Sequence, residues 1–90
     1  MVGKRSMLEI CFDTLKTVQR GIPKPTQIMD ETNISWITLQ TALDSLISSA
    51  FVIIKRKGKS KRYTITKKGE RALSHHEKAL QELGVTPLMV

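Results

Sequence analysis

Residues Ser35 to Lys68, SWITLQTALDSLISSAFVIIKRKGKSKRYTITKK, join a helical pattern to a strand pattern. The first half has apolar residues at helical spacing, which one face of a helix can bury. They are Trp36, Leu39, Leu43, Leu46 and Ile47. Ser35 precedes this face as a predicted N-cap, and Ile34 lies just before it, where an apolar residue can pack back onto the helix. The pattern predicts a helix from Ser35 to about Ala50.

The second half of the stretch has the composition of two strands. Residues 51–54 are rich in β-branched and aromatic side chains, and Tyr63 and Ile65 alternate with polar neighbours. We expect residues 51–56 and 61–66 to pair as an antiparallel hairpin. A four-residue loop, residues 57–60, would join them, with its glycine at the bend.

The tip of this hairpin is strongly basic. Six positive charges fall within eight residues, and they belong to Lys55, Arg56, Lys57, Lys59, Lys61 and Arg62. Like charges this close repel one another, so a protruding hairpin that carries them favours contact with phosphates or with a DNA minor groove. The alternative is a solvated charge run without a partner.

Two further helices are predicted before this stretch. Apolar residues at helical spacing predict an amphipathic helix over residues 5–19, with Ser6 as its N-cap. A short helix over residues 27–32 follows, with Thr26 as its N-cap and Asn33 in the left-handed conformation that ends it. The short helix, the tight turn and the longer helix that follows make a helix-turn-helix unit.

A last helix is predicted over residues 67–83, with Thr66 as its N-cap. Four of its residues recur at spacings of 3, 4 and 3, a heptad seam too short to form a coiled coil alone. They are Leu73, His76, Leu80 and Leu83. Two interpretations stay open: this face packs on the first helix, or it also forms the interface of a homodimer.

Length and composition predict a single domain, residues 1–90, with a thin core. The chain has 15 Lys and Arg against 8 Asp and Glu, a formal net charge of +7, so we expect an anionic partner. Nucleic acid is the first candidate and an acidic membrane surface the second. No apolar run approaches a membrane span, and charged residues interrupt the N-terminal apolar positions, which argues against a secretory signal. The single cysteine, Cys11, permits no internal disulfide, so we expect a buried thiol and a cytoplasmic protein.

Two motifs carry a resemblance to a known family. TQIMDETNISWITLQTALDSLISSAFV, residues 26–52, joins two helices by a tight turn and leads into a strand, and KRYTITKKGERAL, residues 61–73, enters the last helix through Thr-Lys-Lys-Gly. Over residues 5–80 the chain resembles the small archaeal winged helix-turn-helix DNA-binding proteins related to the MarR-type regulators, which include dimeric chromatin-associated members. The resemblance implies a mainly α (α+β) fold in the order helix, helix, helix, strand, strand, helix. It also implies double-stranded DNA as the partner, a homodimer and a place in the nucleoid.

In such a fold the third helix enters the major groove, and the exposed residues of its first half meet base edges. The predicted DNA-reading residues are Ser35, Ile37, Thr38, Gln40 and Thr41. Gln40 can bond an adenine edge, and the two threonines can contact phosphates or thymine methyl groups. This face has no Arg or Asn, so we expect a modest sequence preference. Trp36 is expected in the core, with stacking near the DNA backbone as the alternative.

Other function classes have less support. The sequence has no glycine-rich phosphate loop and no nucleophile motif, and His75 and His76 are adjacent on a helix, which is not metal-ligand spacing. We therefore expect no enzyme activity, cofactor, metal or small-molecule substrate. The main alternative is a winged helix that docks on a protein of the transcription machinery without strong affinity for DNA. RNA binding by the hairpin is a third possibility, and the sequence leaves open whether a DNA-binding role is repression, activation or compaction.

Overall fold

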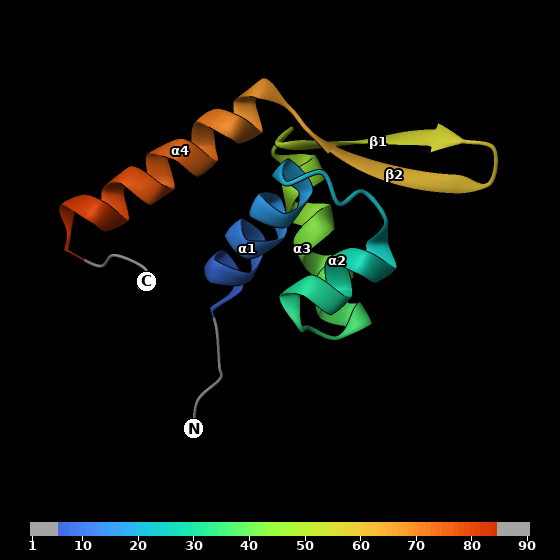
Figure 1. The fold of residues 1–90 in the computed structure, drawn as a ribbon, viewed down its shortest axis with the longest axis horizontal. Helices are drawn as coiled ribbons and strands as arrows, with labels where there is room; N and C mark the ends of the chain where they lie inside the picture. The colour runs from blue at the N-terminus through green and yellow to red at the C-terminus, as the bar shows by residue number, and fades with distance from the viewer. Residues whose placement is uncertain (1–5, 85–90) are drawn as a thin grey trace.

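The computed structural model describes residues 6–84. Within them lie four helices and a two-stranded antiparallel sheet, in the order α1 (Met7–Gln19), α2 (Pro25–Thr32), α3 (Trp36–Ser48), β1 (Val52–Lys57), β2 (Ser60–Ile65) and α4 (Lys67–Glu82). Figure 1 shows α1, α2 and α3 gathered into one body, with the β-hairpin and α4 leaving it in opposite directions. This architecture confirms the predicted winged helix-turn-helix fold, in which the hairpin β1–β2 is the wing.

The core is one contiguous cluster to which every element contributes at least one side chain. It consists of Leu15, Val18, Ile28, Leu39, Leu43, Leu46, Val52, Tyr63 and Leu73. Full burial of an aliphatic side chain stabilises a fold by about 1.5–3 kcal/mol, so this cluster holds the three-helix body, the base of the wing and the start of α4 together. Cys11 packs against its edge and is half-buried rather than fully buried.

Hydroxyl side chains begin three of the helices, as predicted. The Ser6 hydroxyl oxygen accepts the Glu9 N–H at 3.1 Å, and the Glu9 carboxylate accepts the Ser6 N–H at 3.1 Å, which makes a capping box. The Ser35 hydroxyl oxygen accepts the Thr38 N–H at 3.2 Å, and Thr66 caps α4 in the same way. Each such cap stabilises its helix by about 1 kcal/mol, so local chemistry fixes where these helices start.

The start of α2 differs from the prediction. The helix begins at Pro25, with Lys24 at the cap position and no side-chain cap, so Thr26 lies inside the first turn. Proline suits the first helical position because its ring fixes φ and its missing N–H would have no partner there. The end of α2 agrees with the prediction, since Asn33 has φ 55° and ψ 50°, a left-handed conformation. The turn after it leads directly to the Ser35 cap of α3.

The strands of the wing have the predicted length of six residues, but each lies one residue closer to the tip, so the loop is shorter than predicted. Lys57 pairs with Ser60, so the loop consists of Gly58 and Lys59 instead of the four residues 57–60. Gly58 has φ 62°, and a positive φ at the first loop residue is typical of a two-residue type II′ hairpin. The prediction placed the glycine at the bend correctly but counted Lys57 and Ser60, which continue the ladder, as loop residues.

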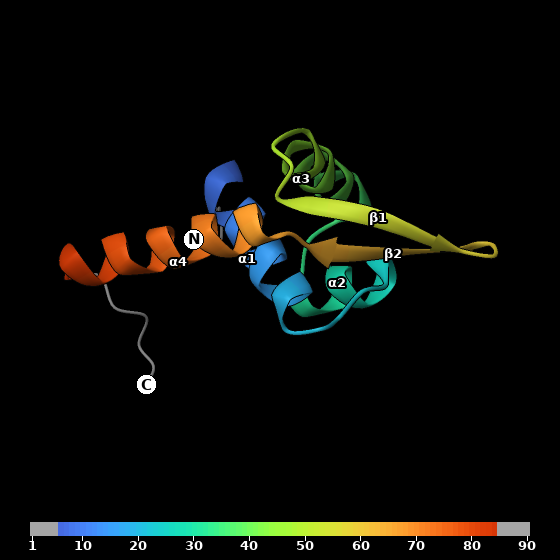
Figure 2. The ribbon, with the colours of Figure 1, turned by 90° about the horizontal axis from the view of Figure 1, so that it is seen from above.

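A close approach of two backbone segments fixes the entry to α4. Gly69 is buried in the first turn of α4, and a Cβ there would collide with the carbonyl oxygen of Phe51 and lie 2.9 Å from Ile65 Cγ1. The Thr66 N–H donates to the same Phe51 carbonyl at 2.9 Å. The glycine therefore lets α4 start against the wing, and Figure 2 shows the outer end of α4 extending away from the body.

Candidate nucleic-acid interface

Helix α3 buries one side and presents the other. On the buried side Leu39, Ala42, Leu43 and Leu46 are each at most 3% exposed. None of the five predicted reading residues belongs to the core. Ser35, Ile37 and Thr41 are exposed, and Thr38 and Gln40 are half-buried. The structure therefore leaves all five side chains on the surface of the first half of α3 or at its cap.

Hydrogen bonds within the helix occupy part of this polar surface. The Ser35 hydroxyl donates to the Thr38 hydroxyl oxygen at 2.9 Å, and the Thr41 hydroxyl donates to the backbone carbonyl of Ile37 at 3.1 Å. The Gln40 side-chain amide has no partner within residues 6–84, so both its donors and its acceptor are available to a ligand. Of the predicted base-reading residues, Gln40 is the one whose hydrogen-bonding groups are all free.

The prediction that Trp36 belongs to the core is wrong. Its side chain is 47% exposed, and its neighbour Ile37 is 77% exposed. Helical spacing indicates which residues share a face, but it does not indicate how far along a helix the covering elements reach. Trp36 is the first residue of α3 and lies beyond the part of the helix that other elements cover. The start of α3 thus presents two adjacent large apolar side chains.

The register of the wing places positive charges directly opposite one another. Lys55 pairs with Arg62, and Arg56 pairs with Lys61. Directly opposed residues share a face of the sheet and neighbouring pairs alternate, so each face of the wing carries one such pair. Like charges opposed across two strands are destabilising, by an amount of the order of 0.2–1 kcal/mol. The wing therefore carries a charge arrangement that is unfavourable for its own folding.

Nothing in the described part of the chain neutralises these charges. None of the six wing cations forms an ion pair with residues 6–84, and no acidic residue lies between Asp44 and Glu70 in the sequence. All six side chains are exposed. An anion bound along the wing would relieve this repulsion, and a polyanion would do so at several sites at once.

Two lysines at the start of α4 enlarge the basic surface. Lys67 and Lys68 are exposed, and the Lys68 ammonium lies 5.7 Å from the centroid of the Phe51 ring, a cation–π distance. Positive charge is unfavourable at a helix N-terminus, where the helix dipole is positive, so a nearby anion would also stabilise this pair.

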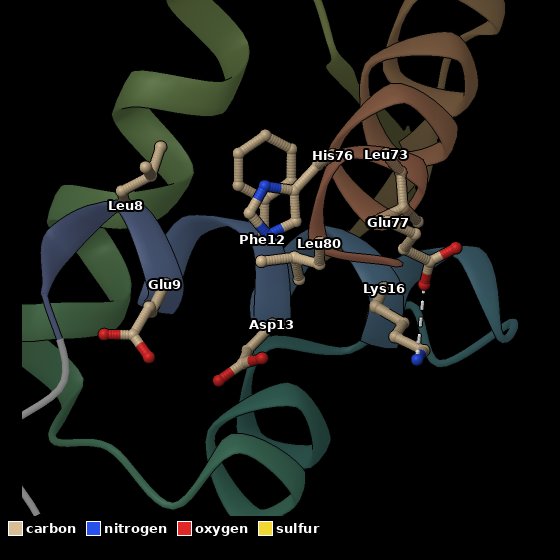
Figure 3. A pocket seen from close by; sticks show the side chains of 9 residues that line it. All are labelled: Leu8, Glu9, Phe12, Asp13, Lys16, Leu73, His76, Glu77 and Leu80. Atoms are coloured by element: carbon tan, nitrogen blue, oxygen red, sulfur yellow. Dashed lines mark ion pairs between the residues drawn. The ribbon is translucent and has the colours of Figure 1, made fainter. Parts of the chain in front are cut away.

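Helices α1 and α4 border a groove of about 480 Å³. The rings of Phe12 and His76 stack across it, with centroids 3.9 Å apart and planes within 1° of parallel. The Lys16 ammonium lies 3.3 Å from the Glu77 carboxylate, as the dashed line in Figure 3 marks. These two contacts tie the middle of α4 to α1.

The four residues of the predicted dimer seam lie in different environments. Leu73 is 2% exposed and belongs to the core of its own chain, whereas Leu83 is 75% exposed. His76 and Leu80 are half-buried and line the groove. The interpretation that this face packs on the first helix is therefore confirmed for the inner residues, Leu73 and His76. The outer residues, Leu80 and Leu83, remain available to a second copy.

Other kinds of site find no basis in the described residues. Between Ser6 and Gly84 no three His, Cys, Asp or Glu side chains come together in a way that could hold a metal ion. Over the same residues, no helix combines the length and the apolar character needed to cross a membrane. Burial raises the pKa of the Cys11 thiol, so a smaller fraction of it is the reactive thiolate at neutral pH.

Comparisons with known proteins agree with this geometry. A family model described as winged helix-turn-helix matches residues 4–83. An uncharacterized protein from Methanocaldococcus jannaschii is 32% identical over 71 residues, which cover 79% of this chain and 69% of that protein. The match to the family model extends over both α3 and the wing.

Two solved structures from Sulfolobus solfataricus are similar in fold. Sso10a-2, a DNA-binding protein, has a TM-score of 0.77 and 27% identity, over 89% of this chain and 83% of its own. The transcriptional regulator BldR has a TM-score of 0.72 and 22% identity, over 83% of this chain and 56% of its own. At that identity the second likeness concerns the fold alone.

Proposed function

The chain belongs to the winged helix-turn-helix family, and from that premise we propose that it binds double-stranded DNA. In this proposal α3 enters a major groove and the wing lies along the adjacent phosphate backbone or minor groove. Binding of this kind serves either transcriptional regulation or the compaction of DNA in the nucleoid. The resemblance to a DNA-binding protein of S. solfataricus supports the same partner.

The observation that carries the proposal is the unneutralised charge of the wing. In two cross-strand pairs, Lys55 with Arg62 and Arg56 with Lys61, cations oppose each other, and none of the four forms an ion pair with residues 6–84. DNA carries one phosphate charge per about 1.7 Å of helix axis, so it can meet several of these cations together. The wing can therefore act as an electrostatic clamp, while α3 supplies a weaker reading surface.

The test is binding of a short duplex across a range of salt concentrations. If each wing neutralises about three to five phosphates, log affinity should fall against log salt with a slope near −0.9 for each contact. The Lys57→Ala, Lys59→Ala, Lys61→Ala triple variant should lose affinity on all sequences about equally and show a shallower slope. No affinity at low salt, or affinity independent of salt, would contradict the proposal.

A matched control separates local contact from net charge. Lys59→Ala and Lys78→Ala each remove one exposed lysine, the first at the wing tip and the second on α4. Long-range attraction predicts similar losses from both, whereas contact predicts a loss for Lys59→Ala alone. Equal losses would contradict a wing contact even if the protein binds DNA.

The alternative functions give different results in the same experiments. A winged helix that docks on a protein of the transcription machinery should bind bare duplex weakly and capture that protein in a pull-down. A preference for RNA would appear when duplex RNA and duplex DNA compete for the protein. The absence of a row of exposed aromatic side chains on the wing argues against recognition of single strands.

We also propose that the outer half of α4 joins two copies in a homodimer. The proposal rests on two uncovered apolar side chains: Leu83, which caps the end of α4 and is 75% exposed, and Leu8, which lines the α1–α4 groove and is 60% exposed. Leu83→Glu should yield monomers by sedimentation without loss of helicity, because this side chain makes no core contact. Ser74→Glu, on an exposed part of the same helix, is the control. A wild-type protein that is monomeric at high concentration would contradict a dimer.

A further inference from the structure

The exposed side chains at the start of α3 are apolar, whereas a DNA-reading helix usually exposes hydrogen-bonding groups there. Ile37 is 77% exposed and Trp36 is 47% exposed, whereas the core residues of the same helix are at most 3% exposed. Two adjacent large apolar side chains on the surface are unfavourable in water and call for a partner that covers them. Their position, at the first two residues after the Ser35 cap, is the part of the helix that meets bases in helix-turn-helix complexes.

Few side chains on the exposed surface of α3 can read bases by hydrogen bonds. The helix has no Lys or Arg, and Asp44 is its one charged residue. The hydroxyl protons of Ser35 and Thr41 are directed to partners within the helix. Gln40 lies three residues after Ile37 and four after Trp36, so the three side chains are neighbours on the helix surface. Beside the apolar pair, this surface therefore offers one side-chain amide, that of Gln40, whose hydrogen-bonding groups are all free of partners within residues 6–84.

The major groove offers one apolar feature, the C5 methyl group of thymine, and an adenine edge suits the amide of a glutamine. We propose that Trp36 and Ile37 read thymine methyl groups while Gln40 reads a neighbouring adenine, so that α3 selects A·T pairs largely by apolar contact. The inference rests on the proposed DNA binding and names what the reading helix recognises. DNA is favoured over a protein as the partner of this pair because the chain that carries it has a net charge of +7 and exposes six cations on its wing.

The decisive probe is a duplex in which deoxyuridine replaces thymidine. This change removes the methyl group and retains the O4 acceptor and every phosphate. We expect the wild-type protein to bind an A·T-rich duplex about fourfold more weakly for each contacted methyl that is lost. The salt dependence should be the same for both duplexes, because the wing contacts are unchanged.

Variants assign the effect to the two side chains. Ile37→Ser and Trp36→Ser should each bind the thymine duplex more weakly and show a smaller difference between thymine and uracil. Met7→Ser is the matched control, since Met7 is 43% exposed and follows the Ser6 cap of α1 as Trp36 follows the Ser35 cap of α3. It should keep the full difference between the two duplexes. Circular dichroism of each variant establishes that the fold is retained.

The single tryptophan gives a direct second readout. The fluorescence of Trp36 should shift when the thymine duplex saturates the protein, and the shift should be smaller with the uracil duplex. Equal affinity for the two duplexes with a normal salt slope would overturn the inference and leave the proposed function standing. A methyl effect that persists in both serine variants would overturn it too. Absence of binding to any duplex would overturn the proposed function itself.

Discussion

The hydroxyl of Thr66 donates a 2.6 Å hydrogen bond to the carbonyl oxygen of Ala50, sixteen residues earlier in the chain. The same hydroxyl oxygen accepts the Gly69 N–H at 3.0 Å, and the Thr66 N–H donates to the Phe51 carbonyl at 2.9 Å. Ala50 itself has φ 62°, a left-handed conformation that turns the chain from α3 into β1. One threonine therefore connects the end of α3, the start of the wing and the first turn of α4.

Removing this hydroxyl should lower stability noticeably. Thr66→Val keeps the shape of the side chain but loses the cap of α4 and the bond to Ala50, each worth about 1 kcal/mol, so we expect a loss of about 2 kcal/mol. Urea unfolding followed by circular dichroism measures it. Thr66→Ser retains the hydroxyl and should lose much less. Equal midpoints for the two variants would show that the hydroxyl is not what matters at this position.

Gly69→Ala should also destabilise the fold, although alanine is the better helix former. By helix propensity alone the change would be favourable by up to about 1 kcal/mol. The new methyl group would instead collide with the Phe51 carbonyl, and forcing a side chain into a packed site costs about 1–3 kcal/mol. Ser74→Ala, at an exposed site of α4, should leave the unfolding midpoint unchanged or raise it slightly. A Gly69→Ala protein as stable as the Ser74→Ala protein would refute the close approach.

The parts of the fold that depend on local chemistry could be predicted from the sequence. The caps at Ser6, Ser35 and Thr66 and the left-handed Asn33 follow from side chains that bond or turn their own backbone, and each was confirmed. The cap at Thr26 was wrong because Pro25 competes for the same helix start and suits its first position better.

The parts that depend on distant segments could not be predicted in this way. The exposure of Trp36 depends on how far other elements cover α3, and the length of the wing loop depends on where pairing between the two strands stops. For the candidate site, the sequence revealed the number of wing cations. It did not reveal that they oppose one another across the strands, because that follows from the register, nor that hydroxyls of α3 bond within the helix.

Because like charges face each other in the wing, removing one of them should raise stability while lowering affinity for DNA. Arg62→Thr removes the cation opposite Lys55, so we expect a gain of about 0.2–1 kcal/mol at low salt. The gain should shrink as salt screens the repulsion, and thermal unfolding at two salt concentrations measures it.

The control for this charge effect lies in the wing loop. Lys59→Thr removes a charge that has no cross-strand partner, so it should lower DNA affinity without raising stability. If both variants gain equally, the effect belongs to net charge and not to the opposed pair.

The single tyrosine, Tyr63, should lose its proton at a higher pH in the folded protein than in the unfolded protein. Burial raises the pKa of Tyr63, the negative charge of Asp44 raises it further, and Arg56 acts in the opposite direction. Because the pKa of Tyr63 in the folded protein lies above the unfolded value of about 10, the buried neutral phenol contributes to stability, and that contribution is complete below pH 10. It is lost as the pH rises through the folded value.

Absorbance of the phenolate measures this titration without ambiguity, because the chain has one tyrosine. The midpoint should lie higher in the native protein than in denaturant, and Asp44→Asn should lower the native midpoint. Identical midpoints in the native and denatured protein would contradict the burial of Tyr63.

The outer end of α4 has a consequence for how such proteins diversify. Residues 81–84 are exposed at every position, and in Figure 1 they lie at the opposite end of the molecule from the wing tip. Substitutions there leave the core, the helix N-caps, α3 and the wing untouched, so the sequence of this end can change without disturbing the fold. A change of assembly partner at this end of α4 would therefore be independent of any change in what α3 and the wing bind.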